Sequence, residues 1–270
     1  MREEFFSIPS FDGHRIYGVL NQNRPANCLV IFVHGLTGEK ENHLYYNAAR
    51  FFPERGIDTC RFDLFSNERD GRRLVDSSLS DFSQDLSSVV QFFADRYQSV
   101  HVVGHSIGGC IAMNAKQSLI RSFILWDTGL QNGSTETGPF EYDERLGYYV
   151  AKLKIQYMLS PKLIKERAQQ GKSVVKKVKR PIMLIFAGNT TINESWVNNF
   201  EYIDSTLEPS FETITIDGAG HGFNELGKSD EVFAATYNWV SRVNRLGGDL
   251  PASKSQSRAM PQTMPVTDKI

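Results

Sequence analysis

The chain has 270 residues, of which 40% are hydrophobic, 23% are charged and 11% are aromatic, an ordinary globular composition. This length can bury a large core, and α/β folds of this size often form a single domain. The formal net charge of -1 gives no electrostatic basis for binding nucleic acid or an anionic membrane surface.

The cysteines and the first residues indicate the compartment. Cys28, Cys60 and Cys110 lack the CxxC spacing of a metal site, and their odd number argues against a disulfide framework. The opening residues, MREEFFSIPSFDG, lack the apolar segment of a signal peptide. The sequence has no apolar run of the roughly 18 residues that a membrane-spanning helix needs. We therefore expect a reducing, cytoplasmic setting and no membrane span.

Strand-like and helix-like segments alternate along most of the chain. Apolar runs predict strands, in chain order, at 14–20, 28–35, 57–63, 99–104, 122–127, 180–188 and 211–218. Amphipathic spacing predicts helices at 42–55, 82–93 and 229–245. This alternation is typical of βαβ units with right-handed crossovers, so it predicts an α/β fold with a mostly parallel sheet.

One long segment interrupts the alternation. Residues 128–180 are too long for an ordinary connection, and they contain ERLGYYVAKLKIQYML (144–159), whose apolar side chains recur at helical spacing. This pattern predicts a small helical cap over one end of the sheet. We therefore divide the chain into a core at 1–127 and 181–246, a cap insertion at 128–180, and a tail at 247–270. The tail is rich in Pro, Ser, Gly and Lys and is expected to be disordered.

The sequence VHVVGHSIGGCIAMNAK (100–116) places Ser106 between a predicted strand and a predicted helix, in the pattern G-x-S-x-G. A strand–turn–helix with this pattern is a nucleophile elbow, in which strained backbone angles expose the serine hydroxyl above the sheet. Gly104 and Gly108 lie two residues to either side, where a Cβ would clash as the strand and the helix approach each other. Ser106 is therefore the predicted nucleophile.

A serine nucleophile needs a base and a site for the oxyanion. His221 follows the last predicted strand in the glycine-rich sequence IDGAGHGFNE, whose small residues let the imidazole turn toward the serine, so it is the predicted base. Backbone N–H groups stabilise the oxyanion of acyl transfer. The predicted donors are Ile107, directly after the serine, and Leu36, in the loop VHGLTG (33–38). His34 is expected to brace this loop by hydrogen bonds.

The motifs HGLTG, RFD, GHSIGG and GAGHGF, in this order over residues 30–222, resemble the α/β-hydrolase superfamily. Within it, HG-x-TG followed by EKE at 39–41 and RFD at 61–63 is similar to the small microbial carboxylesterases and acylesterases, which include the cinnamoyl and feruloyl esterases. The resemblance implies an α/β-hydrolase fold with about eight strands, a cap over the active site and a Ser–acid–His mechanism. These motifs are specific for the superfamily and weak for the substrate.

The acid is where the sequence departs from this pattern. The family usually places the acid about three residues after the glycine that closes the penultimate strand, and Thr191 stands roughly there. Asp127 ends the strand that follows the nucleophile helix, where some members carry their acid, and it is the first candidate. A strand-end aspartate that caps a turn is the structural interpretation of the same residue. Glu194, just past the usual position, is the alternative acid.

These residues predict a serine hydrolase that cleaves an ester or thioester of a medium acyl or aryl group through an acyl-enzyme intermediate. Aromatic residues of the cap would roof the pocket or only seal the cap to the sheet. No metal or organic cofactor is implied, and the expected partner is a small-molecule substrate. Two alternatives stay open: an acyltransferase or non-hydrolytic biosynthetic enzyme, which would tolerate a missing acid, and a ligand-binding relative that has lost catalysis. The sequence does not indicate the oligomeric state.

Overall fold

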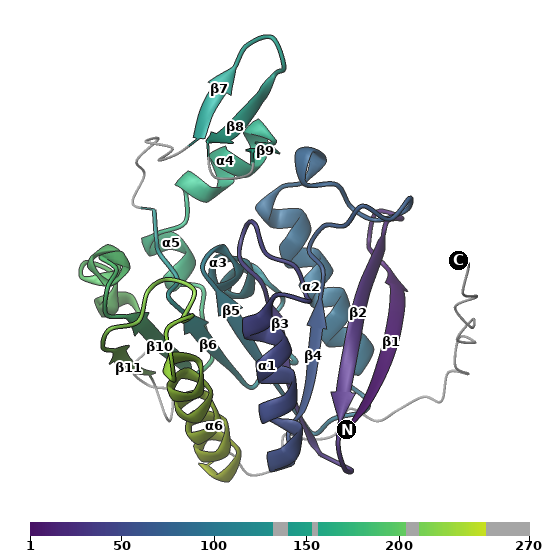
Figure 1. The fold of residues 1–270 in the computed structure, drawn as a ribbon. Coiled ribbons are helices and arrows are strands. Elements are labelled where there is room, and N and C mark those ends of the chain that lie inside the picture. Colours follow the sequence, from purple (N-terminus) through teal and green to yellow (C-terminus); the bar gives the residue numbers. More distant parts are fainter. Residues whose placement is uncertain (132–139, 153–155, 204–210, 247–270) are drawn as a thin grey trace.

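The computed structural model describes residues 1–131, 140–152, 156–203 and 211–246. Its centre is an eight-stranded sheet in the order β1-β2-β4-β3-β5-β6-β10-β11 (Figure 1). The strands are β1 (Arg2–Pro9), β2 (Arg15–Gln22), β3 (Cys28–Val33), β4 (Asp58–Phe62), β5 (Ser99–His105), β6 (Ser122–Trp126), β10 (Ile182–Ala187) and β11 (Phe211–Ile216). β2 runs antiparallel to both of its neighbours, and the other strands are parallel. The predicted mostly parallel sheet is confirmed; β1, which no pattern predicted, adds an antiparallel edge.

Helices cover both faces of the sheet, so its central strands are buried on both sides (Figure 1). Along β3, Leu29 and Ile31 join the core under one pair of helices, and Val30 and Phe32 join the core under the other pair. This is the alternation that a pleated strand imposes, and it explains the continuous apolar run CLVIFV. The first face carries α2 (Leu79–Phe93) and α3 (Ile107–Asn114), and the second carries α1 (His43–Phe51) and α6 (Lys228–Leu246).

Short 3-10 turns complete the core, and the cap elements are inserted between β6 and β10. The turns are η1 (Pro53–Arg55), η2 (Leu74–Asp76), η3 (Ile192–Trp196) and η4 (Phe200–Tyr202). The cap elements are β7 (Phe140–Asp143), β8 (Tyr148–Lys152), β9 (Gln156–Leu159), α4 (Pro161–Ala168) and α5 (Lys172–Val175). In Figure 1 the cap strands and α4 stand beyond one end of the main sheet.

The helix predicted at 144–159 is wrong. The segment contributes β8 and β9, which pair antiparallel with each other, and β8 also pairs with β7. The cause is a turn: the Asp143 carboxylate accepts the N–H groups of Arg145 and Leu146, and Gly147 has a φ of 73°. A helix cannot pass through this turn, so the aromatic and β-branched residues that follow it extend as a strand. The cap is therefore a small antiparallel sheet with two helices.

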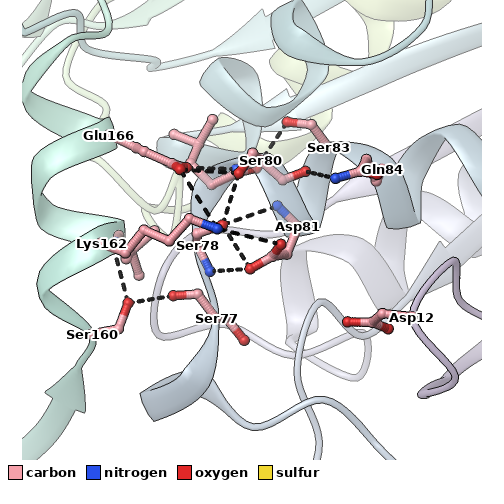
Figure 2. Close-up of polar contacts among 12 residues, drawn as sticks. Asp12, Ser77, Ser78, Ser80, Asp81, Ser83, Gln84, Ser160, Lys162 and Glu166 are labelled. Carbon is pink, nitrogen blue, oxygen red and sulfur yellow. Dashed lines mark hydrogen bonds and ion pairs between the residues drawn. The ribbon is translucent and has the colours of Figure 1, made fainter.

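Polar contacts join α4 of the cap to the start of α2 (Figure 2). The Glu166 carboxylate accepts the Ser80 N–H at 2.8 Å and the Ser80 hydroxyl at 3.0 Å. The Ser160 hydroxyl, at the N-cap of α4, donates to the Ser77 carbonyl, and the Lys162 ammonium lies 3.9 Å from Glu166. A carboxylate is favourable at a helix start because the first N–H groups there have no helical partner. Because α2 starts beyond the carboxyl end of β4, these contacts hold the cap at the carboxyl edge of the sheet.

The sequence predicts no membrane span and a disordered tail at 247–270. None of the helices in the described residues is both long enough and apolar enough to cross a membrane. The predicted tail at 247–270 lies outside the described residues.

Candidate active site

Ser106 lies in the tight turn between β5 and α3. Its backbone has a φ of 56° and a ψ of -124°, which residues with a side chain rarely adopt, and its N–H donates to the Trp126 carbonyl at 2.9 Å. A Cβ at Gly104 would lie 2.5 Å from the backbone of α3, and one at Gly108 would lie 2.3 Å from the Val33 carbonyl oxygen. The two glycines therefore allow the close approach of helix and strands that the elbow needs.

The two predicted oxyanion donors lie at the start of α3 and in the loop after β3. Ile107 is the first residue of α3, where the N–H has no partner within the helix. In the loop after β3, the Gly35 carbonyl accepts from the Gly38 N–H at 3.0 Å and from His34 Nδ1 at 2.7 Å. The N–H of a trans peptide points opposite to its carbonyl, so these contacts direct the Leu36 N–H to the other side of the loop.

Hydrogen bonds hold the loop at 33–38, which carries the predicted donor Leu36 and is called the oxyanion loop below, and the segment that follows it. His34 Nε2 accepts the Leu64 N–H at 3.0 Å, and burial lowers the pKa of His34, so its neutral ring accepts there and donates from Nδ1. Further along, the Lys40 N–H and ammonium both reach the Asp63 carboxylate, at 2.8 and 2.7 Å, and Arg61 donates to the Lys40 carbonyl at 3.2 Å. Arg61 and Asp63 of the RFD motif thus hold the backbone at Lys40, just after the oxyanion loop.

Asp127 directly follows β6, is 0% exposed, and lies beside the predicted base. Its Oδ2 is 2.7 Å from His221 Nδ1. Its Oδ1 accepts the Ala187 N–H at 3.0 Å and lies 3.1 Å from the Thr190 hydroxyl, which is also 3.0 Å from the Ala187 carbonyl oxygen. These donors fix the orientation of the carboxylate and offset the cost of burying it.

The loop after β10, where the family usually carries its acid, supplies a hydroxyl in place of a carboxylate. Thr190 makes this contact, and Thr191, the residue aligned by sequence, is exposed. β6 and β10 are neighbours in the sheet, so Asp127 reaches the same space from one strand away. The alternative acid Glu194 is exposed in η3, and within the described residues no hydrogen bond or ion pair joins it to His221. No local sequence pattern identifies Thr190, because its contact with Asp127 joins the loop after β10 to the end of β6.

His221 lies in the loop after β11, and its side chain is 45% exposed. The loop is closed by the Gly220 N–H, which donates to the Glu225 carboxylate at 3.0 Å. The His221 carbonyl lies 2.7 Å from Nε2 of His105, and the centroids of the two imidazole rings are 4.9 Å apart. The side chain and the backbone of His221 are thus each held by one buried residue.

The predicted site residues follow β3, β5, β6 and β11, whose carboxyl ends meet at one edge of a parallel sheet. A Cβ at Gly35 would lie 3.4 Å from the Ser106 Cβ, so the oxyanion loop is adjacent to the elbow. His105, which contacts the His221 loop, directly precedes Ser106 in the chain. A surface groove is lined by Thr37, next to the predicted donor Leu36, and by core and cap residues that include Phe65, Leu74 and Tyr157; Ser106, Asp127 and His221 do not line it.

The fold matches known proteins over nearly the whole chain. The model of the alpha/beta hydrolase family matches residues 30–236. Est1E from Butyrivibrio proteoclasticus, solved with ferulic acid bound, is 17% identical with a TM-score of 0.69, over 87% of this chain and 99% of that chain. The esterase domain of a Rhodothermus marinus protein is 15% identical with a TM-score of 0.67, over 90% and 100%. A Pyrococcus furiosus esterase is 17% identical with a TM-score of 0.63, over 90% and 91%. A search of curated proteins gives no match.

Proposed function

Because the chain belongs to the alpha/beta hydrolase family, we propose that it is a serine hydrolase that cleaves an ester or thioester of a medium acyl or aryl group. The observation that carries this proposal is the 2.7 Å contact between His221 Nδ1 and Asp127 Oδ2. An acid at Nδ1 holds the hydrogen there and leaves Nε2 as the lone pair that takes the serine proton. Ser106, in its strained turn, is the proposed nucleophile whose proton this base takes.

In the proposed mechanism, Ser106 Oγ attacks the carbonyl carbon of the substrate while His221 Nε2 takes the hydroxyl proton. The carbonyl oxygen becomes negatively charged and accepts hydrogen bonds from the N–H groups of Leu36 and Ile107. Asp127 stabilises the imidazolium that forms. His221 then returns the proton to the leaving alcohol or thiol, which leaves an acyl group on Ser106.

In the second half of the proposed reaction, a water molecule attacks the acyl-enzyme. His221 takes a proton from this water, and the same two N–H groups hold the new oxyanion. Its collapse breaks the bond to Ser106, and His221 returns the proton to Oγ. The products are a carboxylic acid and the regenerated serine.

Hydrolysis has better support than the two alternatives. Acyl transfer would account for the missing carboxylate at position 191, but the carboxylate of Asp127, which lies beside His221, makes that explanation unnecessary. A ligand-binding protein would have no use for the strained backbone of Ser106, which carries a free-energy cost of about 1–3 kcal/mol. The buried acid beside an exposed histidine likewise favours a catalytic role.

Turnover of p-nitrophenyl esters and of methyl ferulate tests the proposal, because Est1E, a similar fold, was solved with ferulic acid. The wild type is expected to release the carboxylic acid, and Ser106→Ala is expected to lower kcat by at least about 10³-fold without unfolding the protein. A fluorophosphonate probe should label Ser106 in the wild type. Transfer of the acyl group to an added alcohol in preference to water would favour the acyltransferase alternative. A turnover rate of Ser106→Ala equal to that of the wild type would refute the assignment of Ser106 as the nucleophile.

A further inference from the structure

A buried chain of hydrogen bonds joins the oxyanion loop to the histidine loop through two side chains that the proposed mechanism does not use. The Gly35 N–H donates to the Tyr45 hydroxyl at 3.2 Å, and this hydroxyl lies 2.9 Å from His105 Nδ1. His105 Nε2 in turn lies 2.7 Å from the His221 carbonyl oxygen. Tyr45 comes from α1 and is 3% exposed, and His105 is 9% exposed.

Every hydrogen in this chain has one position. A carbonyl only accepts, so His105 Nε2 must carry a hydrogen toward His221. Burial and the neighbouring His221 lower the pKa of His105 to about 4, so its ring is neutral at pH 7 and Nδ1 is a lone pair. Burial also raises the pKa of Tyr45, so its hydroxyl keeps its hydrogen and donates it to Nδ1. The same hydroxyl accepts from the Gly35 N–H through a lone pair, so it bonds to both neighbours at once.

The residues at the two ends of this chain belong to the proposed machinery. His221 lies between glycines and its side chain is 45% exposed; His105 holds its backbone carbonyl, as Asp127 holds its side chain. At the other end, Gly35 precedes the oxyanion donor Leu36 and lies against the elbow. One tyrosine hydroxyl therefore lies between the base and the oxyanion site.

We propose that Tyr45 is a positioning residue, whose hydroxyl joins His105 to the Gly35 backbone and thereby fixes the His221 loop relative to the oxyanion loop. This inference rests on the proposed function. Without the hydroxyl, the His221 carbonyl still keeps the hydrogen on Nε2, but the His105 Nδ1 lone pair and the Gly35 N–H both lose their shared partner and are left buried without a hydrogen bond. The link between the two loops is then broken, and the His105 ring and the His221 carbonyl that it holds shift relative to Gly35. A displacement of about 1 Å in a catalytic group lowers the rate by about 10²-fold.

Tyr45→Phe tests this directly, because the ring keeps its packing against Phe32 and only the hydroxyl is lost. We expect kcat to fall about 10- to 100-fold, with KM changed less than about twofold, because no substrate-binding group is altered. Tyr46→Phe is the matched control: it removes the same atom from the next residue of α1, whose 38% exposed ring lies beside Arg61. An unchanged kcat in Tyr45→Phe, or an equal fall in Tyr46→Phe, would overturn the proposal.

Substitution of His105 provides a rescue experiment that does not alter Tyr45. In His105→Gln, the amide nitrogen takes the place of Nε2 and can still donate to the His221 carbonyl. In His105→Phe, the ring remains and both hydrogen bonds are lost. We expect kcat of His105→Gln to lie at least about tenfold above that of His105→Phe. Equal kcat values in the two folded variants would contradict the positioning role.

Nuclear magnetic resonance of protein labelled with 15N in its histidines and glycines tests this link without reference to activity. The wild type should show His105, assigned by its loss in His105→Gln, with hydrogen on Nε2 only. Tyr45→Phe should keep the hydrogen on Nε2 but shift the Nδ1 resonance and the Gly35 and Gly222 amides, and Tyr46→Phe should shift none of them. An unchanged Gly222 amide in Tyr45→Phe overturns the proposal even if the wild type hydrolyses esters. If the wild type hydrolyses none, the proposed function fails, and the Gly222 shift still decides whether Tyr45 fixes the His221 loop.

Discussion

Asp127 Oδ2 lies 2.7 Å from His221 Nδ1, although the two residues are 94 positions apart and Asp127 follows β6, not β10. The adjacent strand supplies the supporting donors, the Ala187 N–H and the Thr190 hydroxyl. The carboxylate of one strand is thus oriented by donors of the next strand. The proposed acid therefore follows β6, which is the neighbour of β10, the strand after which the sequence pattern places the acid.

Asp127→Asn is expected to lower kcat by about 10⁴-fold, because the amide no longer holds the reactive tautomer of His221 or stabilises its positive charge. Glu194→Gln, which alters the alternative acid in exposed η3, should leave kcat within about twofold of the wild type. Steady-state kinetics with p-nitrophenyl butyrate measures both variants. The opposite pattern, with activity lost in Glu194→Gln and kept in Asp127→Asn, would assign the acid to Glu194.

Thr190→Val removes the hydroxyl that donates to the Asp127 carboxylate while keeping the size of the side chain. A hydrogen bond to a charged group contributes about 1.5–3 kcal/mol, so we expect kcat to fall about 10-fold or more. Thr191→Val is the control, because that neighbouring side chain is exposed. Equal kinetics in the two variants would show that Asp127 needs no support from the Thr190 hydroxyl.

The buried histidines make the free energy of unfolding depend on pH. Burial lowers the pKa of His101 and of His105 to about 4 each, whereas an unfolded histidine titrates near 6.5. The unfolded chain therefore binds more protons between these values, and stability is lost as the pH falls from about 6.5 toward 4. We expect a loss of about 2 kcal/mol per histidine between pH 7 and pH 5, measured by urea unfolding. His101→Gln should reduce this slope, and a slope equal to that of the wild type would contradict the assignment.

Glu166→Ala removes the carboxylate that joins α4 of the cap to the start of α2 (Figure 2). Two hydrogen bonds are lost, so we expect a stability loss of about 1–2 kcal/mol and faster amide exchange in α4. KM for aryl esters should rise several-fold, because we expect the cap to cover the aryl group, while p-nitrophenyl acetate should be little affected. Lys165→Ala, an exposed change on the same helix, should alter neither quantity. A uniform change for both esters would place the effect in the core.

The parts of the fold and site that depend on local sequence could be predicted. The central strands are continuous apolar runs, and the elbow of Ser106 and the loop of Leu36 are each defined within a few residues. The pairing of Asp127 with His221 could only be proposed among alternatives, because it depends on which strand lies beside β10. Thr190 and Tyr45 have no local pattern, since their contacts join separate elements.

The cap shows how periodicity alone misleads. Leu146, Tyr149 and Val150 satisfy helical spacing, yet Tyr149 and Val150 are consecutive residues of a strand and lie on opposite faces of it. Gly147 and the turn at Asp143 decided the outcome, and the pairing with β7 and β9 stabilised it. β1 was not predicted because an edge strand with partly exposed residues has no continuous apolar run.

The most direct measurement mixes the protein with a p-nitrophenyl ester, quenches the reaction in acid within the first turnover, and maps the mass of its peptides. An acyl group on the peptide that contains Ser106, formed together with a burst of p-nitrophenol and absent from Ser106→Ala, is the predicted result. Turnover by the wild type with no acyl group on Ser106 at any time, and undiminished turnover by Ser106→Ala, would contradict the proposed mechanism.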